Sequence, residues 1–183
     1  MLAATRAIER LGPSRLTLAD VAQEVGLAPA TLVQRFGSKR GLLLAVAGQG
    51  ASGVREQFLA IRARSRSPLH AIREVARCMA GMAKSPEALA NHLAFLEMDL
   101  ADRDFHRLAL EHARKFRAEL RSLVAEAVRA GELRPCPTAR LADAVQAVIG
   151  GSLLNWAVHR DGKASTRILT DLETLLAPYR AAK

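Results

Sequence analysis

Three polar side chains able to hydrogen-bond to nucleic-acid bases lie close together near the start of the chain. They are Thr31, Gln34 and Arg35, whose spacing of three and four residues puts them on one face of a helix. A glutamine can form two hydrogen bonds to adenine, and an arginine can bind guanine or a phosphate. These residue types in this pattern are suited to the major groove of double-stranded DNA.

The surrounding residues predict the elements that position this face. A short amphipathic helix ends before Gly26, which allows the positive φ of a sharp turn. A second helix then opens at Pro29 and carries the polar face. This is the pattern of a helix-turn-helix, whose second helix enters the major groove. The apolar residues expected to face inward are Val21, Ala22, Val25, Leu27, Leu32 and Phe36.

A plain helical hairpin inside a bundle is the structural alternative, but it leaves the polar outer face of the second helix without a role. The next residues favour DNA binding further. Ser38 is expected to cap a following helix, and Lys39 stands in its first turn, beside the positive end of the helix dipole. A backbone phosphate at this point would meet both the ammonium group and free N–H groups.

The segment Leu18 to Ala45 resembles the N-terminal module of the TetR family of transcriptional repressors. The family's spacing is matched at Asp20, Ala22, Gly26, Thr31, Leu32, Phe36, Ser38, Lys39 and Leu42. Two positions depart from the family, because Ala28 replaces its usual serine and Val33 its frequent tyrosine. The resemblance implies a double-stranded DNA operator contacted by Thr17, Pro29, Ala30, Thr31, Val33, Gln34, Arg35 and Lys39.

Apolar residues recur every three or four positions throughout the chain, so we expect an all-α fold of about nine helices. Their expected ranges are 2–11, 18–24, 28–35, 39–63, 68–83, 86–100, 103–130, 138–160 and 165–181. Short helices fill the first 37 residues, and longer ones fill the rest. We therefore predict a helix-turn-helix DNA-binding domain over residues 1–46 and a ligand-binding and dimerisation domain over residues 47–183.

The last two predicted helices carry apolar stripes. These stripes either complete one core or, as the resemblance implies, pair with their copies in a homodimer. A two-fold dimer would place two recognition helices about one DNA turn apart, as a palindromic operator requires. The residues expected at the dimer interface are Leu141, Val145, Val148, Leu153, Ile168, Leu172 and Leu175.

The middle helices hold large adaptable apolar side chains that either fill the core or, as the resemblance implies, line a pocket for a small-molecule effector. The candidate pocket residues are Phe58, Met79, Met82, Phe95, Met98, Phe105, Phe116 and Trp156. We expect a mainly hydrophobic effector that releases a repressor from its operator. The alternative is a helical ligand-binding or metal-storage module without specific DNA binding.

Composition narrows the remaining choices. The 183 residues are 50% hydrophobic and carry 27 Lys and Arg against 18 Asp and Glu, a net charge of +9 that favours anionic partners. No apolar run is long enough to predict a membrane span or a signal peptide, so we expect a cytoplasmic protein. Cys78 and Cys136 read as free thiols rather than a redox pair. No catalytic motif, ExxH pair or metal-ligand spacing occurs, so we expect no enzyme activity, metal or cofactor.

Overall fold

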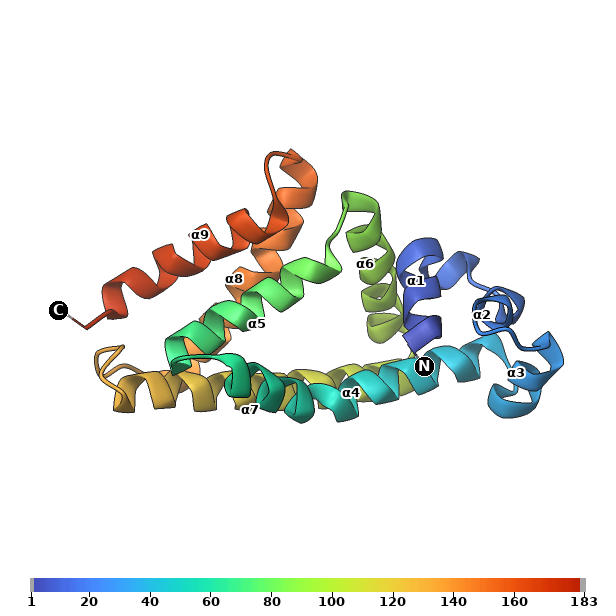
Figure 1. The fold of residues 1–183 in the computed structure, drawn as a ribbon, viewed down its shortest axis with the longest axis horizontal. Coiled ribbons are helices and arrows are strands. Elements are labelled where there is room, and N and C mark those ends of the chain that lie inside the picture. The colour runs from blue at the N-terminus through green and yellow to red at the C-terminus, as the bar shows by residue number, and fades with distance from the viewer. Residues whose placement is uncertain (1, 182–183) are drawn as a thin grey trace. The chain divides into compact units, whose positions relative to one another are not determined.

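The computed structural model describes residues 2–181, and helices account for almost all of its regular structure (Figure 1). The helices are α1 Leu2–Arg15, α2 Leu18–Glu24, α3 Pro29–Phe36, α4 Lys39–Arg64, α5 Pro68–Met82, α6 Pro86–Ala101, α7 Arg103–Arg129, α8 Thr138–His159 and α9 Ala164–Leu176. A short 3-10 helix follows at Ala177–Tyr179. The predicted all-α fold and the nine helices are confirmed over this part of the chain.

Two helices differ from their predicted ranges by more than one residue at an end. Helix α1 continues to Arg15 beyond a non-helical Gly12, whose φ of 73° kinks it just before Pro13. Helix α9 ends at Leu176 rather than at residue 181, because Pro178 cannot continue the hydrogen-bonding pattern. The residues after it pair instead with an earlier segment, through an isolated antiparallel bridge between Leu133 and Arg180.

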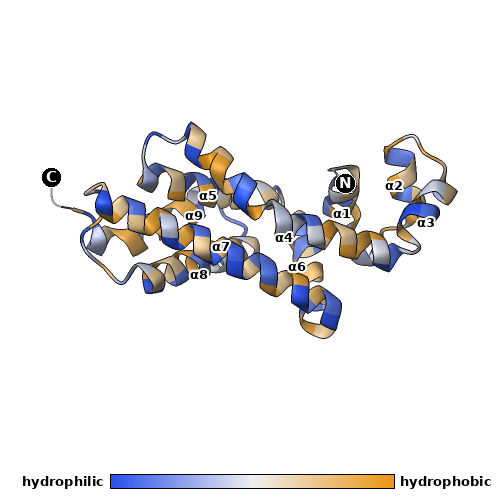
Figure 2. Cartoon of the chain, turned by 90° about the horizontal axis from the view of Figure 1, so that it is seen from below, coloured by the Kyte–Doolittle hydropathy of each residue, from blue (hydrophilic) through white to orange (hydrophobic). Residues whose placement is uncertain are grey.

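The chain forms two compact units. One contains the residues up to Gly53 together with Glu87–Ala113, and the other contains Val54–Pro86 together with the residues from Arg114 onward. This division differs from the predicted boundary at residue 46, because α6 and the first part of α7 group with the N-terminal helices. Hydrophobic and hydrophilic residues are interspersed along the helices, as Figure 2 shows.

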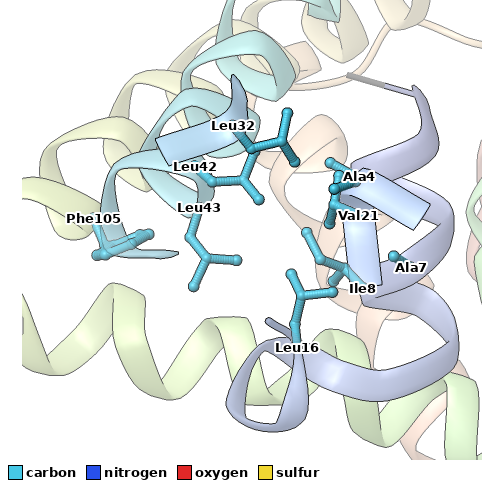
Figure 3. Close-up of a cluster of buried hydrophobic side chains, with 10 residues drawn as sticks. Ala4, Ala7, Ile8, Leu16, Val21, Leu32, Leu42, Leu43 and Phe105 are labelled. Atoms are coloured by element: carbon cyan, nitrogen blue, oxygen red, sulfur yellow. The ribbon is translucent and has the colours of Figure 1, made fainter. Parts of the chain in front are cut away.

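A hydrophobic cluster forms the centre of the N-terminal unit (Figure 3). Leu32 of α3 and Leu42 and Leu43 of α4 meet Phe105 of α7 in this cluster. The other buried members are Ala4, Ala7, Ile8, Leu16, Val21 and Ala22. Val25 and Leu27, which were predicted to face inward, are instead 43% and 45% exposed. Both follow the last residue of α2, where the helical period no longer fixes the direction of the side chain.

The C-terminal unit is built on α5, α8 and α9, which pack against one another. Their buried side chains are mainly aliphatic, and Phe58 of α4 meets Phe116 of α7 edge to face, with ring centroids 5.2 Å apart. Polar contacts tie the elements together. Arg62 pairs with Glu119 at 2.7 Å, and the Ser152 hydroxyl donates to Asp171 at 2.7 Å.

A glycine allows the close approach between the end of α3 and the start of α4. A Cβ added at Gly41 would lie 2.0 Å from the backbone oxygen of Phe36, far inside van der Waals contact. Gly50, in the same helix, has no atom within 4 Å of such a Cβ. The two positions therefore differ in packing although both are helical glycines.

We predict that Gly41→Ala lowers the free energy of unfolding by about 1–3 kcal/mol, because the methyl group forces α3 and α4 apart. Gly50→Ala is the matched control and raises that free energy by up to about 1 kcal/mol, as alanine favours a helix. Urea unfolding of both variants measures the two changes. Equal stabilisation by both substitutions would contradict the close approach.

Candidate nucleic-acid interface

Helix α3 has a single buried residue and presents the rest of its surface to solvent. Leu32 is 4% exposed and Phe36 is half-buried, so these two residues fix which side of the helix faces the core. The predicted DNA-contacting residues Pro29, Ala30, Thr31, Val33, Gln34 and Arg35 are all exposed. The structure therefore brings these residues together on the outer surface of one helix.

The turns on either side of the helix-turn-helix have the predicted local chemistry. Thr17 caps α2 in a capping box: its hydroxyl accepts from the Asp20 amide at 3.1 Å, and its own amide donates to the Asp20 carboxylate at 2.7 Å. The Thr17 hydroxyl also donates to the Asp20 carboxylate, and this bond, followed by the one from the Thr17 amide, holds the pKa of Asp20 below its usual value. Gly26 has the expected positive φ of 67°. The Ser38 hydroxyl accepts from the Gly41 amide at 3.1 Å, so its predicted capping role is confirmed.

The start of α4 is fastened to the end of α1. Lys39 is half-buried, and its Nζ donates to the backbone carbonyl of Ser14 at 2.6 Å. A cation at the end of a helix interacts favourably with the partial negative charge of its last carbonyls. The ammonium therefore has a fixed position next to α3, although no carboxylate neutralises it.

The six basic residues between positions 2 and 47 separate into two groups. Arg6 and Arg10 pair with Glu24, and Arg40 pairs with Asp102 and Asp104. The other three, Arg15, Arg35 and Lys39, form no ion pair with a carboxylate in the described part of the chain. They stand at the end of α1, in the last turn of α3 and at the start of α4. Within residues 2–47, the uncompensated positive charge thus lies around α3.

The Arg40 cluster joins α4 to the turn between α6 and α7. Arg40 Nη2 donates to Asp102 at 2.8 Å and to Asp104 at 2.8 Å, and its guanidinium lies over the Phe105 ring. Hydrogen bonding to Arg40 is the main cause that lowers the pKa of Asp102. A lowered carboxyl pKa stabilises the fold above the ordinary pKa, and this contribution is lost as the pH falls. Sequence reasoning missed this cluster, because its residues are some 62 positions apart.

Comparison with known proteins agrees with this geometry. A sequence profile described as "Bacterial regulatory proteins, tetR family" matches residues 1–46. A second, described as "BetI-type transcriptional repressor, C-terminal", matches residues 68–179, more than half of the chain. The chain belongs to the TetR family of transcriptional regulators. The family consists of DNA-binding regulators of transcription rather than enzymes.

Solved structures of TetR-family proteins share this fold at low sequence identity. A TetR transcription regulator from Haloarcula marismortui has a TM-score of 0.77 and 14% identity, covering 98% of this chain and 95% of its own. FadR from Bacillus subtilis, in complex with stearoyl-CoA, has a TM-score of 0.72 and 16% identity, and the match covers 96% of this chain and 95% of FadR. A TetR-family regulator from Agrobacterium tumefaciens has a TM-score of 0.72 and 20% identity, and the match covers 96% of this chain and 92% of that regulator. No curated protein matches the chain significantly.

The eight residues predicted to line an effector pocket are divided between the two compact units. Phe105 is buried in the hydrophobic cluster of the N-terminal unit, and Phe95 and Met98 pack against that cluster. In the C-terminal unit, Phe58 and Phe116 contact each other, while Met79 is half-buried and Met82 is exposed. Trp156 borders a cavity of about 330 Å³, and its Nε1 donates to the Gly162 carbonyl at 3.2 Å. A pocket lined by these residues therefore stays a prediction.

Most residues predicted at a dimer interface serve the core of their own C-terminal unit. Val148 and Leu175 are half-buried, and the other five are at most 7% exposed. These five are Leu141, Val145, Leu153, Ile168 and Leu172, and none of them has surface to offer a partner. The apolar stripes of α8 and α9 face each other and α5, since these three helices pack together.

One exposed stripe of α8 is also apolar. Ala147 and Gly150 are exposed, and they lead at helical spacing to Leu154 and Val158, which are 46% and 79% exposed. By length and composition alone, α8 is the one described helix long and apolar enough to cross a membrane; 39% of its most apolar window is buried. On α9, the exposed residues Thr166, Thr170 and Thr174 repeat every four positions. Each of the two helices therefore exposes a row of uncharged side chains, apolar on α8 and threonine on α9.

Proposed function

We propose that this TetR-family protein is a repressor that binds a palindromic DNA operator as a homodimer and is released by a small, mainly hydrophobic effector. The observation that carries the DNA-binding part is the exposed face of α3, with Gln34 at its centre and three uncompensated cations around it. Such a regulator acts in the cytoplasm, where it has access to the DNA.

We expect two kinds of contact at the operator, one to base edges and one to backbone phosphates. Gln34 points directly away from the buried Leu32 side of α3 and has an amide able to bond to adenine in the major groove. Thr31 lies beside it with a hydroxyl that serves the same purpose. Lys39, together with Arg15 and Arg35, supplies charge for backbone phosphates, which position the protein without reading sequence.

The homodimer is supported by the uncovered faces of α8 and α9. Exposed Leu154 and Val158 lose contact with water if a second copy covers them, and Ala147 and Gly150 are small enough to let another helix approach closely. A symmetric partner places the same face of its own helix against this one. The interface thus moves from the buried side chains predicted from the sequence to the exposed side chains of the same two helices.

Release by an effector is supported by the relatives. The C-terminal segment matches a profile of BetI-type transcriptional repressors, and the B. subtilis FadR structure contains stearoyl-CoA, a ligand with a long apolar chain. A ligand weakens operator binding only if it prefers a conformation that DNA does not. By reciprocity, the operator then weakens binding of the ligand by the same factor.

Substitutions of Gln34 and Lys39 are expected to have different effects on specific and non-specific DNA binding. Fragments selected from genomic DNA provide the operator, and a shuffled duplex provides the non-specific reference. Gln34→Ala should weaken operator binding by about 1–3 kcal/mol and leave the shuffled duplex unaffected, because only the base contact is lost. Lys39→Gln keeps a donor for the Ser14 carbonyl but removes the charge, so both duplexes should bind more weakly and the salt dependence should flatten by about one phosphate contact.

Anisotropy titrations over a range of salt concentrations measure these effects. Arg6→Gln is the control for Lys39→Gln, because Arg6 is already paired with Glu24. The control variant should change the salt dependence much less. Equal losses on both duplexes for Gln34→Ala would contradict its assignment to base reading.

The dimer is tested at an exposed position, where a new charge does not disturb the core. Leu154→Glu would place two carboxylates near the two-fold axis, at a cost of several kcal/mol if both stay ionised, so monomers are expected. Leu59→Glu, at an exposed leucine of α4, is the matched control and should remain dimeric. Sedimentation velocity distinguishes the two. A dimer that persists in Leu154→Glu would place the interface elsewhere.

The effector model predicts a reciprocal effect on affinity. Small molecules that raise the melting temperature are first selected from a panel of apolar compounds that includes stearoyl-CoA. Calorimetry then compares the affinity of the best compound with and without saturating operator. A drop of about 5–150-fold in the presence of operator is expected. Identical affinities would reject release by that compound.

A further inference from the structure

Helix α3 is chemically different on the two sides of Gln34. Successive residues of a helix are rotated by about 100°, so Ala30 and Val33 lie on one side of Gln34, and Thr31 and Arg35 lie on the other. The second side is polar, and its Arg35 guanidinium lies over the Phe36 ring, 5.4 Å from the ring centroid. The first side consists of exposed apolar groups: the side chains of Pro29 and Ala30, and that of Val33, which is 48% exposed.

We propose that Ala30 and Val33 form a contact for the C5-methyl group of a thymine next to the base pair that Gln34 reads. This inference rests on the proposed operator binding and adds the identity of one base. The thymine methyl is the apolar group that a base pair presents in the major groove. The patch is bordered by Gln34, which can bond to a base, and by the cations Arg35 and Lys39, which can bind phosphates. These neighbours make DNA the partner that the patch suits.

The size of the side chains favours such a contact. Ala30 stands at the second position of α3, and Val33 follows one turn later, so both belong to the part of a recognition helix that approaches base edges. Neither side chain is long enough to hold α3 away from the groove. Because Val33 is almost half exposed in the free protein, a methyl group placed against it would shield apolar surface of both partners from water.

The same patch disfavours other bases. A cytosine in place of the thymine has a hydrogen at C5 where the thymine has its methyl group. Val33 would then lose its apolar partner and stay exposed to water. Val33 thus discriminates by the presence of the methyl group.

Replacement of thymine by uracil tests the contact, because it removes the methyl group and leaves every hydrogen-bonding group of the base pair unchanged. Each thymine of one operator half-site is replaced in turn, and dissociation constants are measured at one fixed salt concentration. At one thymine, uracil should weaken binding of the unaltered protein about fourfold, as expected for one methyl group removed from an apolar contact. In Val33→Ala, the same replacement should have almost no effect.

Val33→Ala should fold normally, because the side chain is exposed and alanine favours a helix; circular dichroism verifies this. Val25→Ala is the matched control, since Val25 is a similarly exposed valine outside α3, and it should keep the fourfold effect of uracil. The inference is overturned if replacement of thymine by uracil weakens binding at no position. It is also overturned if that replacement weakens binding of Val33→Ala as much as it weakens binding of the unaltered protein. Failure to select any specific operator would instead overturn the proposed function itself.

Discussion

Burial of Leu32 is the constraint on which the DNA-binding surface depends. Helix α3 has eight residues, too few to be stable as an isolated helix in water, and Leu32 is its one buried residue. The hydrophobic cluster that receives Leu32 contains residues of α1, α2, α4 and α7, so four other helices determine how α3 is rotated about its axis. The glycine at position 41 then lets the start of α4 approach the last carbonyl of α3. With that rotation fixed, Gln34 is directed outward and cannot turn toward the core.

In the segment from residue 2 to 47, ion pairing determines where the excess positive charge lies. The segment from residue 2 to 47 has only three more basic than acidic residues, an excess that does not by itself mark a face. Glu24 pairs with Arg6 and Arg10 of α1, and the carboxylates before and within the start of α7 pair with Arg40. The cations that remain are those nearest α3. Ion pairs between side chains far apart in sequence thus leave a positive potential around one short helix.

The sequence was sufficient to predict features that depend on neighbouring residues. Helix ranges, the capping role of Ser38, and the outward position of Gln34 all follow from local periodicity and local hydrogen bonding. Features that depend on distant contacts were missed or wrong. Val25 and Leu27 were assigned to the core because they are apolar, and Phe105 was assigned to a pocket although it belongs to the cluster around Leu32. The pairing of Arg40 with Asp102 has no local signal at all.

Helix α8 shows why an apolar stripe does not by itself identify an interface. Val145 and Ile149 are buried in their own unit, whereas Leu154 and Val158, equally apolar, are exposed on the same helix. A periodic pattern reports only that a residue avoids water, and it does not distinguish the core of one chain from the surface between two. The distinction requires knowing which side of α8 is already occupied, and the packing of α5 and α9 supplies that knowledge. The uncovered residues include the small Ala147 and Gly150 and the apolar Leu154 and Val158, a combination that suits close packing against another helix.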